Sequence, residues 1–293
     1  MLRGLHHVTA IAGDPQANLR FYTEFLGLRL VKKTVNFDDP GTYHLYYGDS
    51  GGTPGTLITF FAWPGSPRAR KGSGQPTEIA LTIGRDSLSY WKARCLQHGV
   101  PFTPLVRFGD ETLEIEDPDG ITLHLVAAGD APGVSRIRSV TLAELDPLHA
   151  SRFLTDTLGM LVLSEEHDRT RLAFEDGCFL DLLHSTANRG SAGSGVIHHV
   201  ALRCDDESSL AAWRDRVIAA GMKATIILDR RYFHSTYFRE RDAKGVGGVL
   251  FEIATTGPGF TVDEPLEHLG ETLALPPWLE PSRESIERRL PKL

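Results

Sequence analysis

Two pairs of adjacent histidines, each inside a short apolar run, are the residues of this chain whose types and spacing suggest chemistry. LHHVTA begins at residue 5 and IHHVAL at residue 197. Glu252 lies in a third apolar run, GGVLFEIA, where an unpaired carboxylate would be costly to bury. Two imidazoles and one carboxylate on one face bind non-haem Fe(II) and leave coordination positions open. The residue types therefore predict a metal site, while the spacing alone leaves manganese, nickel and zinc as alternatives to iron.

The spacing within each pair also limits how many histidines bind the metal. Side chains alternate between the two faces of a β-strand, so only one histidine of each pair is expected to face the metal. The other is expected to face elsewhere or to lie behind the ligand. His44, in GTYHLYYGD, is also ambiguous, because it either lines the site or packs against a neighbouring strand.

The chain repeats itself, and the repeat supplies the elements that would position these residues. Residues 6–28, HHVTAIAGDPQANLRFYTEFLGL, align without a gap with residues 138–160, RSVTLAELDPLHASRFLTDTLGM. Each copy has the pattern of a strand, an Asp-Pro helix start and a helix that ends at a glycine. A second pair, EIALTIGRDSLSYWKARCLQHGV and HVALRCDDESSLAAWRDRVIAAGM, follows the same order from residues 78 and 199.

Short strands are expected after each helix, so the repeating unit is a βαβββ module of about 55–65 residues. Two such modules would pack their sheets into a cupped half-barrel, and four modules make two cups. The predicted fold is therefore α+β. The modules are expected near residues 4–65, 76–128, 136–186 and 195–256. The domains are expected at 1–130 (N-terminal, modules 1 and 2) and 131–258 (C-terminal, modules 3 and 4), followed by a tail at 259–293.

The alignment of the copies shows which residues are not repeated. Structural residues should recur in both copies, as the VT, DP and LG pairs do. The metal-ligand candidates do not recur, and this marks one half of the molecule as specialised. They align as His7 with Ser139, His199 with Glu78, and Glu252 with His124.

Composition limits the class of protein. The formal net charge of −7 argues against a nucleic-acid or anionic-membrane partner. No run approaches the ~18 apolar residues of a membrane span, and the N-terminus shows no signal-peptide core. Cys95, Cys178 and Cys204 show no paired spacing, which favours a reducing compartment. A cytoplasmic protein is therefore expected.

Longer stretches resemble a known family. GLHHVTAIAGDPQANLRFYTEFLGLRLVKKTVNFDDPGTYHLYYGD, DRRYFHSTYFRE and GGVLFEIATTGPGF resemble the vicinal oxygen chelate (glyoxalase/extradiol dioxygenase) superfamily, and within it the hydroquinone-type ring-cleaving dioxygenases. The resemblance covers nearly the whole chain. It implies an Fe(II)-dependent extradiol-type dioxygenase that opens a hydroquinone or substituted hydroquinone, with Mn(II) or another divalent metal as alternatives. It also favours a homodimer.

The resemblance assigns roles residue by residue. It implies that His7, His199 and Glu252 are the metal ligands, in a cup formed by modules 1 and 4. The cup of modules 2 and 3 would be a degenerate site without metal. Arg230 would stabilise a phenolate, Tyr237 would donate a hydrogen bond, and His6 or His198 would move a proton. The implied set around the substrate comprises His6, Thr9, His198, Arg230 and Tyr237.

One departure and two rival functions accompany the resemblance. RDAKGV, which begins at residue 241, replaces a tight turn and is expected beside the iron pocket, with Arg241 and Lys244 near its mouth.

A glyoxalase-type metal-dependent lyase, isomerase or thiol transferase is the first alternative function. A non-catalytic protein that binds small aromatics is the second, and the intact ligand set argues against it. The sequence does not determine which substituents the ring of the substrate carries.

Overall fold

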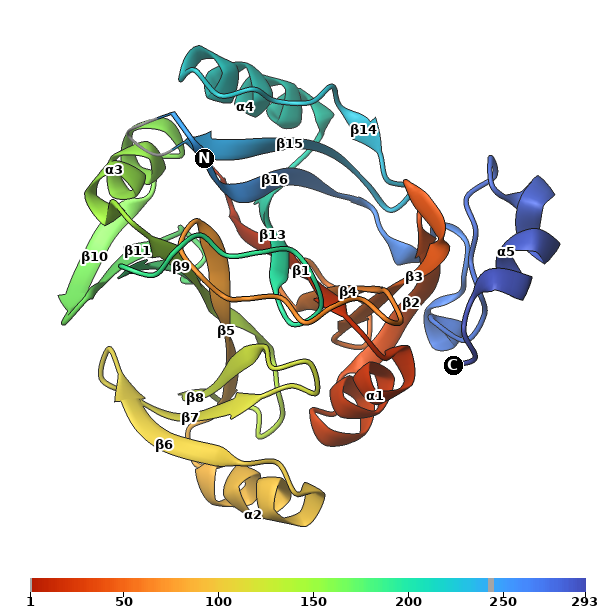
Figure 1. Ribbon diagram of the computed structural model, residues 1–293, viewed down its shortest axis with the longest axis horizontal. Helices are drawn as coiled ribbons and strands as arrows, with labels where there is room; N and C mark the ends of the chain where they lie inside the picture. Colours follow the sequence, from red (N-terminus) through yellow and green to blue (C-terminus); the bar gives the residue numbers. More distant parts are fainter. Residues whose placement is uncertain (1, 242–244) are drawn as a thin grey trace.

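The four predicted modules are present, and their strands form two eight-stranded sheets. The computed structural model describes residues 2–241 and 245–293. Each sheet curls into a half-barrel with helices on its outer side (Figure 1). Each module runs strand, helix and then three strands. The predicted α+β class, with βαβββ modules in two cups, is therefore confirmed.

The first cup is built from modules 1 and 4, which lie at opposite ends of the chain. Antiparallel pairing of β1 with β13 joins them, in the strand order β14-β15-β16-β13-β1-β4-β3-β2. This pairing of modules is the one that the resemblance implied. The strands are β1 (Gly4–Ala12), β2 (Arg29–Asn36), β3 (Asp39–Gly48), β4 (Leu57–Ala62), β13 (Ile197–Cys204), β14 (Leu228–Asp229), β15 (Phe233–Arg241) and β16 (Gly247–Pro258).

The second cup joins modules 2 and 3 in the same way, through antiparallel pairing of β5 with β9. Each cup thus takes one module from each of the two domains expected from the sequence. The strands are β5 (Gln75–Gly84), β6 (Phe102–Arg107), β7 (Asp110–Glu116), β8 (Thr122–Gly129), β9 (Arg136–Glu144), β10 (Leu161–Glu166), β11 (Arg169–Ala173) and β12 (Phe179–His184).

The helices of modules 1 and 3 begin at the predicted Asp-Pro pairs. The side chain of Asp14 accepts hydrogen bonds from two backbone amides of the first turn, and Asp146 accepts one from the amide of His149. In both modules the α-helix continues into a π-helical turn, at Phe21–Phe25 and Phe153–Thr157. The helices are α1 (Pro15–Arg20), α2 (Leu88–His98), α3 (Pro147–Arg152), α4 (Glu207–Ala219) and α5 (Arg283–Arg289).

The predicted glycine ends of these two helices are also confirmed. Gly27 and Gly159 have φ angles of 74° and 75°, a left-handed conformation that favours glycine. Phe21, Tyr22 and Phe25 are buried against the sheet, in an apolar core that draws residues from all four modules. Burial of this face fixes the helix against the convex side of the first cup, so the concave side is left for the site.

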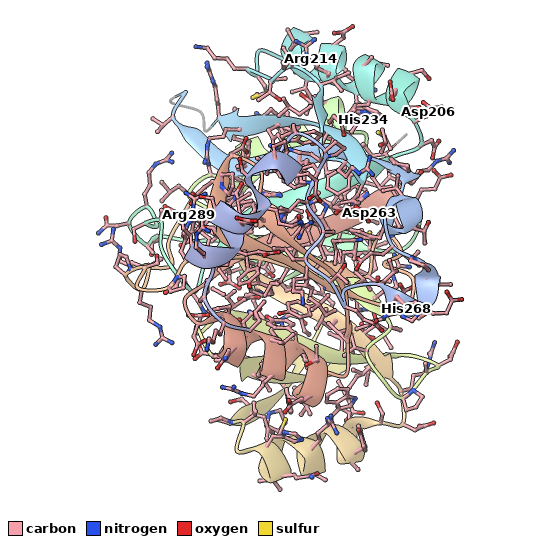
Figure 2. All side chains as sticks on the ribbon, turned by 90° about the vertical axis from the view of Figure 1, so that its right-hand side faces the viewer. Asp206, Arg214, His234, Asp263, His268 and Arg289 are labelled. Atoms are coloured by element: carbon pink, nitrogen blue, oxygen red, sulfur yellow. The ribbon has the colours of Figure 1, made fainter. Side chains whose placement is uncertain are left out.

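The tail after β16 packs against β2 and β3 and ends in α5 (Figures 1 and 2). Lys32 on β2 is fully buried, and its ammonium group contacts the carboxylates of Asp263, at 2.6 Å, and of Glu264 in the tail. The guanidinium of Arg29 donates to the backbone carbonyl of Glu267. No helix within the described ranges is both long and apolar enough to cross a membrane.

Candidate metal centre

Three side chains from three adjacent strands of the first cup meet at one point. His7 comes from β1, His199 from β13 and Glu252 from β16, and each is at most 2% exposed. The Oε2 atom of Glu252 lies 3.1 Å from Nε2 of His7 and 3.0 Å from Nε2 of His199. One ligand atom from each residue lies within 4.8 Å of the others. The structure therefore brings together the three residues that the sequence indicated as metal ligands.

The surroundings of Glu252 fit a cation. Both of its carboxylate oxygens are shielded from solvent, and neither has a hydrogen-bond partner in the described part of the chain. Burial works to raise the pKa of this carboxyl, but the imidazoles of His7 and His199 outweigh it and hold the pKa well below its usual range. A buried carboxylate that accepts no hydrogen bond is costly unless a cation satisfies it. Two imidazole nitrogens and a carboxylate oxygen suit a divalent transition metal.

Each histidine pair lies at an irregularity in the pairing of β1 with β13. Leu5 pairs with Leu202 but His7 with Ala201, so His6 is an extra residue in β1. Thr9 pairs with His199 but Ala10 with Ile197, so His198 is an extra residue in β13. A bulge of this kind interrupts the alternation of side chains and redirects one of them. The neighbouring imidazoles can therefore touch, with Nδ1 to Nδ1 distances of 2.9 Å in the first pair and 2.7 Å in the second.

The same irregularities occur in the second cup. There Thr77 is the extra residue in β5 and Arg138 is the extra residue in β9. These positions align with His198 and His6 in the repeat. The bulges are therefore a feature of the fold, whereas the histidines are specific to the first cup.

The contact behind His7 selects which of its nitrogens faces the metal. Nε2 of His6 lies 3.1 Å from the backbone carbonyl of Thr255, which can only accept, so Nε2 of His6 holds the proton. Burial and the neighbouring His7 lower the pKa of His6 to about 3, so His6 is neutral and its Nδ1 accepts. Nδ1–H of His7 then donates to His6, and Nε2 of His7 is left with a lone pair toward Glu252.

We predict that His6→Leu weakens metal binding by about 10- to 100-fold, the usual effect of removing a hydrogen-bond partner of a metal ligand. His6→Asn should lose less, because its side-chain oxygen can still accept from Nδ1 of His7. Competition with a chelating dye for Zn(II) or Mn(II) measures both affinities. Equal affinities of the wild type and His6→Leu would show that the orientation of His7 does not depend on this contact.

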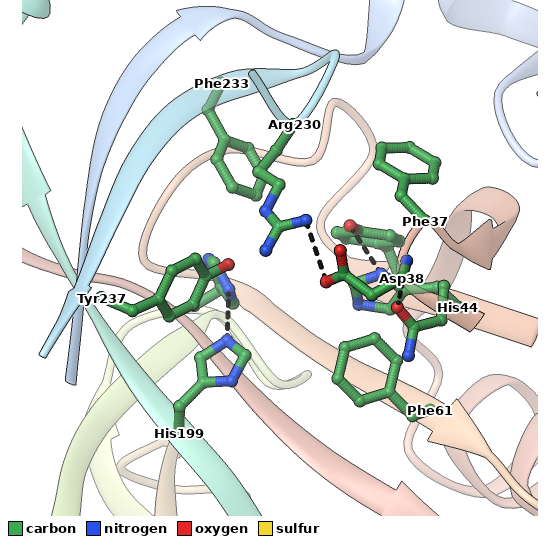
Figure 3. A pocket seen from close by; sticks show the side chains of 11 residues that line it. Phe37, Asp38, His44, Phe61, His199, Arg230, Phe233 and Tyr237 are labelled. Atoms are coloured by element: carbon green, nitrogen blue, oxygen red, sulfur yellow. Dashed lines mark hydrogen bonds and ion pairs between the residues drawn. The ribbon is translucent and has the colours of Figure 1, made fainter. Parts of the chain in front are cut away.

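A pocket of about 350 Å³, counted with the open space at its mouth, adjoins the two imidazoles. Three phenylalanines form its apolar walls, and Arg230 reaches across it toward Asp38 (Figure 3). Tyr237 borders His199, with the ring centroids 5.5 Å apart. The lining residues are His7, Asn36, Phe37, Asp38, His44, Tyr46, Phe61, His199, Arg230, Phe233 and Tyr237.

Two of the residues assigned around the substrate, Arg230 and Tyr237, line this pocket. The guanidinium carbon of Arg230 lies 5.1 Å from the centroid of the Tyr237 ring. Burial and the neighbouring Glu252 carboxylate raise the pKa of Tyr237 well above its usual range. The Tyr237 hydroxyl therefore keeps its proton at neutral pH and is a hydrogen-bond donor.

The other three assigned residues lie behind the pocket wall and are not among its lining residues. His6 and His198 lie behind the two imidazole ligands, as described above. The Thr9 hydroxyl lies 2.8 Å from that of Thr59, which in turn lies 2.9 Å from Nε2 of His44. Thr9 is thus one end of a chain of hydrogen bonds that reaches the pocket at His44.

His44 is a pocket residue that the sequence left ambiguous. Its Nδ1 lies 2.9 Å from the Tyr46 hydroxyl, so both of its nitrogens are engaged. The sequence feature that could have identified His44 as a pocket residue is its spacing from Tyr46. The two residues are two positions apart on β3 and therefore lie on one face of the strand. Asp38, Phe37 and Phe61 carried no such signal, because only the folded chain places them beside the triad.

A second cavity lies along the same strands, beyond the triad. It is lined by His198, by Arg189 and Arg239, and by Gly247 and Gly248 among others. The two glycines follow the segment RDAKGV, which the sequence placed beside the metal pocket. That expectation is wrong for the described residues on either side of the segment. Arg239 on β15 and Gly247 and Gly248 on β16 line this other cavity and not the metal pocket. Lys244 lies outside the described residues.

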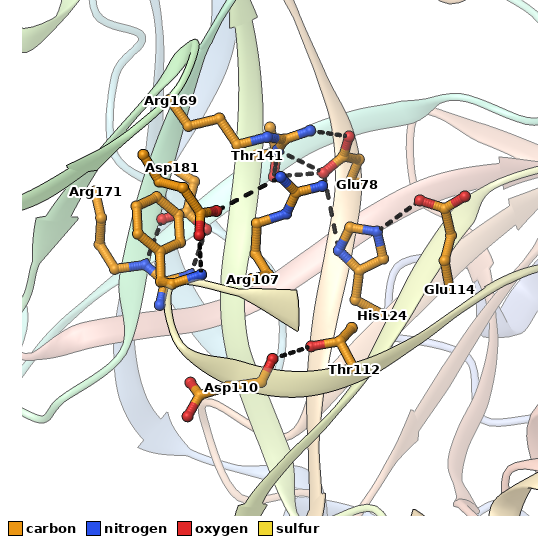
Figure 4. Close-up of polar contacts among 12 residues, drawn as sticks. Glu78, Arg107, Asp110, Thr112, Glu114, His124, Thr141, Arg169, Arg171 and Asp181 are labelled. Carbon is orange, nitrogen blue, oxygen red and sulfur yellow. Dashed lines mark hydrogen bonds and ion pairs between the residues drawn. The ribbon is translucent and has the colours of Figure 1, made fainter. Parts of the chain in front are cut away.

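The second cup holds an ion-pair network where the first cup holds the triad (Figure 4). Ala201 pairs with Glu252 and Ala80 pairs with His124, which confirms the alignment of the two cups. Glu78, the counterpart of His199, receives two hydrogen bonds from the Arg169 guanidinium, at 2.8 and 2.9 Å. A guanidinium therefore already satisfies the carboxylate that stands in a ligand position.

Comparison with known proteins gives a consistent result. The model of the Glyoxalase/Bleomycin resistance protein/Dioxygenase superfamily matches residues 4–125 and 136–253. The chain is 42% identical over 312 residues to "Putative ring-cleaving dioxygenase MhqE" of Bacillus subtilis, covering 99% of each chain. It is 29% identical over 313 residues to "Chlorohydroquinone/hydroquinone 1,2-dioxygenase" of Sphingobium indicum, covering 99% of this chain and 96% of the other. A crystal structure titled as a "putative dioxygenase" from Bacillus subtilis superposes with a TM-score of 0.93 at 38% identity, covering 100% of this chain and 97% of the other.

Proposed function

Because the chain belongs to the Glyoxalase/Bleomycin resistance protein/Dioxygenase superfamily, we propose that it is a cytoplasmic ring-cleaving dioxygenase that opens a hydroquinone in an extradiol-type reaction. The observation that carries the proposal is the buried His7, His199 and Glu252 triad at the end of an aromatic-walled pocket. The relatives named as ring-cleaving and hydroquinone dioxygenases support the reaction and the class of substrate.

The triad would hold the metal, for which we propose Fe(II). When bound, Fe(II) would supply open coordination positions and the redox chemistry that dioxygen requires. Glu252 would neutralise one of its charges, while Nε2 of His7 and of His199 would supply neutral ligands. These assignments use the atoms that already converge in the fold.

The chain's own pocket residues would bind and orient the substrate. Phe61 and Phe233 offer apolar surface to a flat aromatic ring. The Arg230 guanidinium stays cationic and favours a phenolate over a phenol. The Tyr237 hydroxyl, which keeps its proton, would donate to an oxygen on which negative charge develops. Burial of the triad keeps bulk water from competing for these contacts.

The test is dioxygen uptake by protein loaded anaerobically with Fe(II), on hydroquinone, methylhydroquinone, chlorohydroquinone and catechol. Uptake with a hydroquinone that is lost in His199→Ala is expected. His124→Ala is the matched control, since it changes the equivalent region of the second cup and should retain uptake. Absence of uptake in protein shown to contain iron would overturn the proposal. Lewis-acid chemistry would then be tested with Ni(II), Zn(II) or Mn(II) on the glutathione hemithioacetal.

Tyr237→Phe is expected to lower kcat by about 100-fold with KM nearly unchanged. Its hydroxyl would act on charge that develops during the reaction, and removal of one such donor typically costs a factor of about 100 to 1,000. Steady-state kinetics on the best substrate of the panel measures both constants. An increase in KM with kcat retained would instead assign Tyr237 to substrate binding.

A further inference from the structure

Two turns from opposite ends of the chain meet at the mouth of the triad pocket. Asp38 lies in the turn between β2 and β3, and Arg230 precedes β15. Their side chains form an ion pair, with Nη1 of Arg230 3.2 Å from Oδ2 of Asp38 (Figure 3). The side-chain oxygen of Asn36 accepts the backbone N–H of Asp38 and holds the turn. Module 1 and module 4 thus share one polar contact across the pocket.

Among the polar groups of this pocket, Asp38 is the one suited to accept a hydrogen bond from a bound molecule. Both nitrogens of His44 are engaged by Tyr46 and Thr59. Arg230 can only donate, and its Nε is buried without a partner among the described residues. Asp38 is the carboxylate among the lining residues, and its ion pair with Arg230 is made through Oδ2. Its Oδ1 atom can therefore accept a hydrogen bond from a bound molecule.

We propose that Asp38 accepts a hydrogen bond from the hydroxyl group of the substrate that does not lie at the triad, and so selects 1,4-dihydroxybenzenes. This inference rests on the proposed function. In such a molecule the two hydroxyls lie at opposite ends of the ring, whereas in catechol both lie side by side. Asp38 lies across the pocket from His199 (Figure 3), so a hydroxyl at each end of the ring meets a partner.

Arg230 makes this carboxylate a better receptor than a free surface acid. Its guanidinium orients the carboxylate through the ion pair, and a carboxylate accepts stronger hydrogen bonds than a neutral group. The Asp38 side chain is 76% exposed, however, so water competes for the same oxygen. The preference should therefore lie at the lower end for a charged hydrogen bond, about tenfold in affinity.

The experiment compares the dissociation constants of hydroquinone and 4-fluorophenol under anaerobic conditions, by calorimetry on Fe(II)-loaded protein. Fluorine is close to a hydroxyl in size but cannot donate a hydrogen bond. The wild type should bind hydroquinone about tenfold more tightly than 4-fluorophenol. Asp38→Ala should weaken hydroquinone binding to the level of 4-fluorophenol, which it should leave nearly unchanged. Asp39→Ala is the matched control, because Asp39 accepts from Thr42 and Trp63 and does not line the pocket.

The outcomes separate this inference from the proposed function. Equal affinities of the wild type for the two phenols, or an unchanged ratio in Asp38→Ala, would overturn the role of Asp38. Loss of the preference in Asp39→Ala as well would overturn it too, because the effect would then come from the turn as a whole. Wild-type protein that binds both phenols but consumes no dioxygen would overturn the proposed reaction and leave the binding comparison intact.

Discussion

Glu252→Gln should abolish the binding of Fe(II) while leaving the metal-free protein at least as stable as the wild type. In the described part of the chain the buried carboxylate oxygens of Glu252 have no hydrogen-bond partner, so in the metal-free protein only the neighbouring imidazoles offset the cost of burying the charge. A glutamine removes that charge, and its amide can donate to Nε2 of His7 or His199. The loss in metal affinity should exceed the 10- to 100-fold effect of changing a residue behind a ligand.

Thermal unfolding with and without metal measures both halves of this prediction. Metal at about 100 times its dissociation constant should stabilise the wild type by about 2.7 kcal/mol and the variant not at all. His124→Gln is the control, because His124 holds the equivalent position in the second cup and contacts Glu114. It should keep the full metal-dependent shift. A metal-free Glu252→Gln protein much less stable than the wild type would show that Glu252 is a structural residue.

Arg169→Met should lower the free energy of unfolding by about 3 kcal/mol, because it leaves the Glu78 carboxylate inside the second cup without its guanidinium. The two side chains are 8% and 14% exposed, so water cannot fully replace the lost contact. Burial works to raise the pKa of Glu78, but Arg169 outweighs it and lowers the pKa below its usual 4.5. The stabilisation is therefore present above about pH 4.5 and is lost as the pH falls through the lowered pKa.

Urea unfolding at pH 7 and below pH 4 measures this effect, and the difference from the wild type should narrow in acid. The double variant Glu78→Gln/Arg169→Met should recover most of the loss, since it removes the unpaired charge together with its partner. Metal binding at the triad should be unchanged in both variants. A single variant as stable as the wild type at pH 7 would mean that Thr141 and His124 alone satisfy Glu78.

The repeat made much of the fold readable from the sequence. Asp14, Asp146, Gly27 and Gly159 act through hydrogen bonds and backbone angles within their own turns, so their roles do not depend on distant contacts. The comparison of the aligned modules also separated the residues that recur because the fold requires them from the residues that occur in only one cup. That contrast, together with the residue types, indicated the metal-ligand set that the structure brings together.

Tertiary structure alone decided how that set is supported and what surrounds it. The bulges at His6 and His198 arise from the pairing of β1 with β13, strands almost 200 residues apart, and no pattern within either strand specifies them. The carbonyl of Thr255 reaches His6 only because β16 lies beside β13 in the same sheet. Asp38 and Arg230 meet because the sheet curls and brings the turns at its two ends together. The residue types and repeats in the sequence thus determined the modules and the ligands, while contacts between distant modules determined the ligand orientation and the pocket.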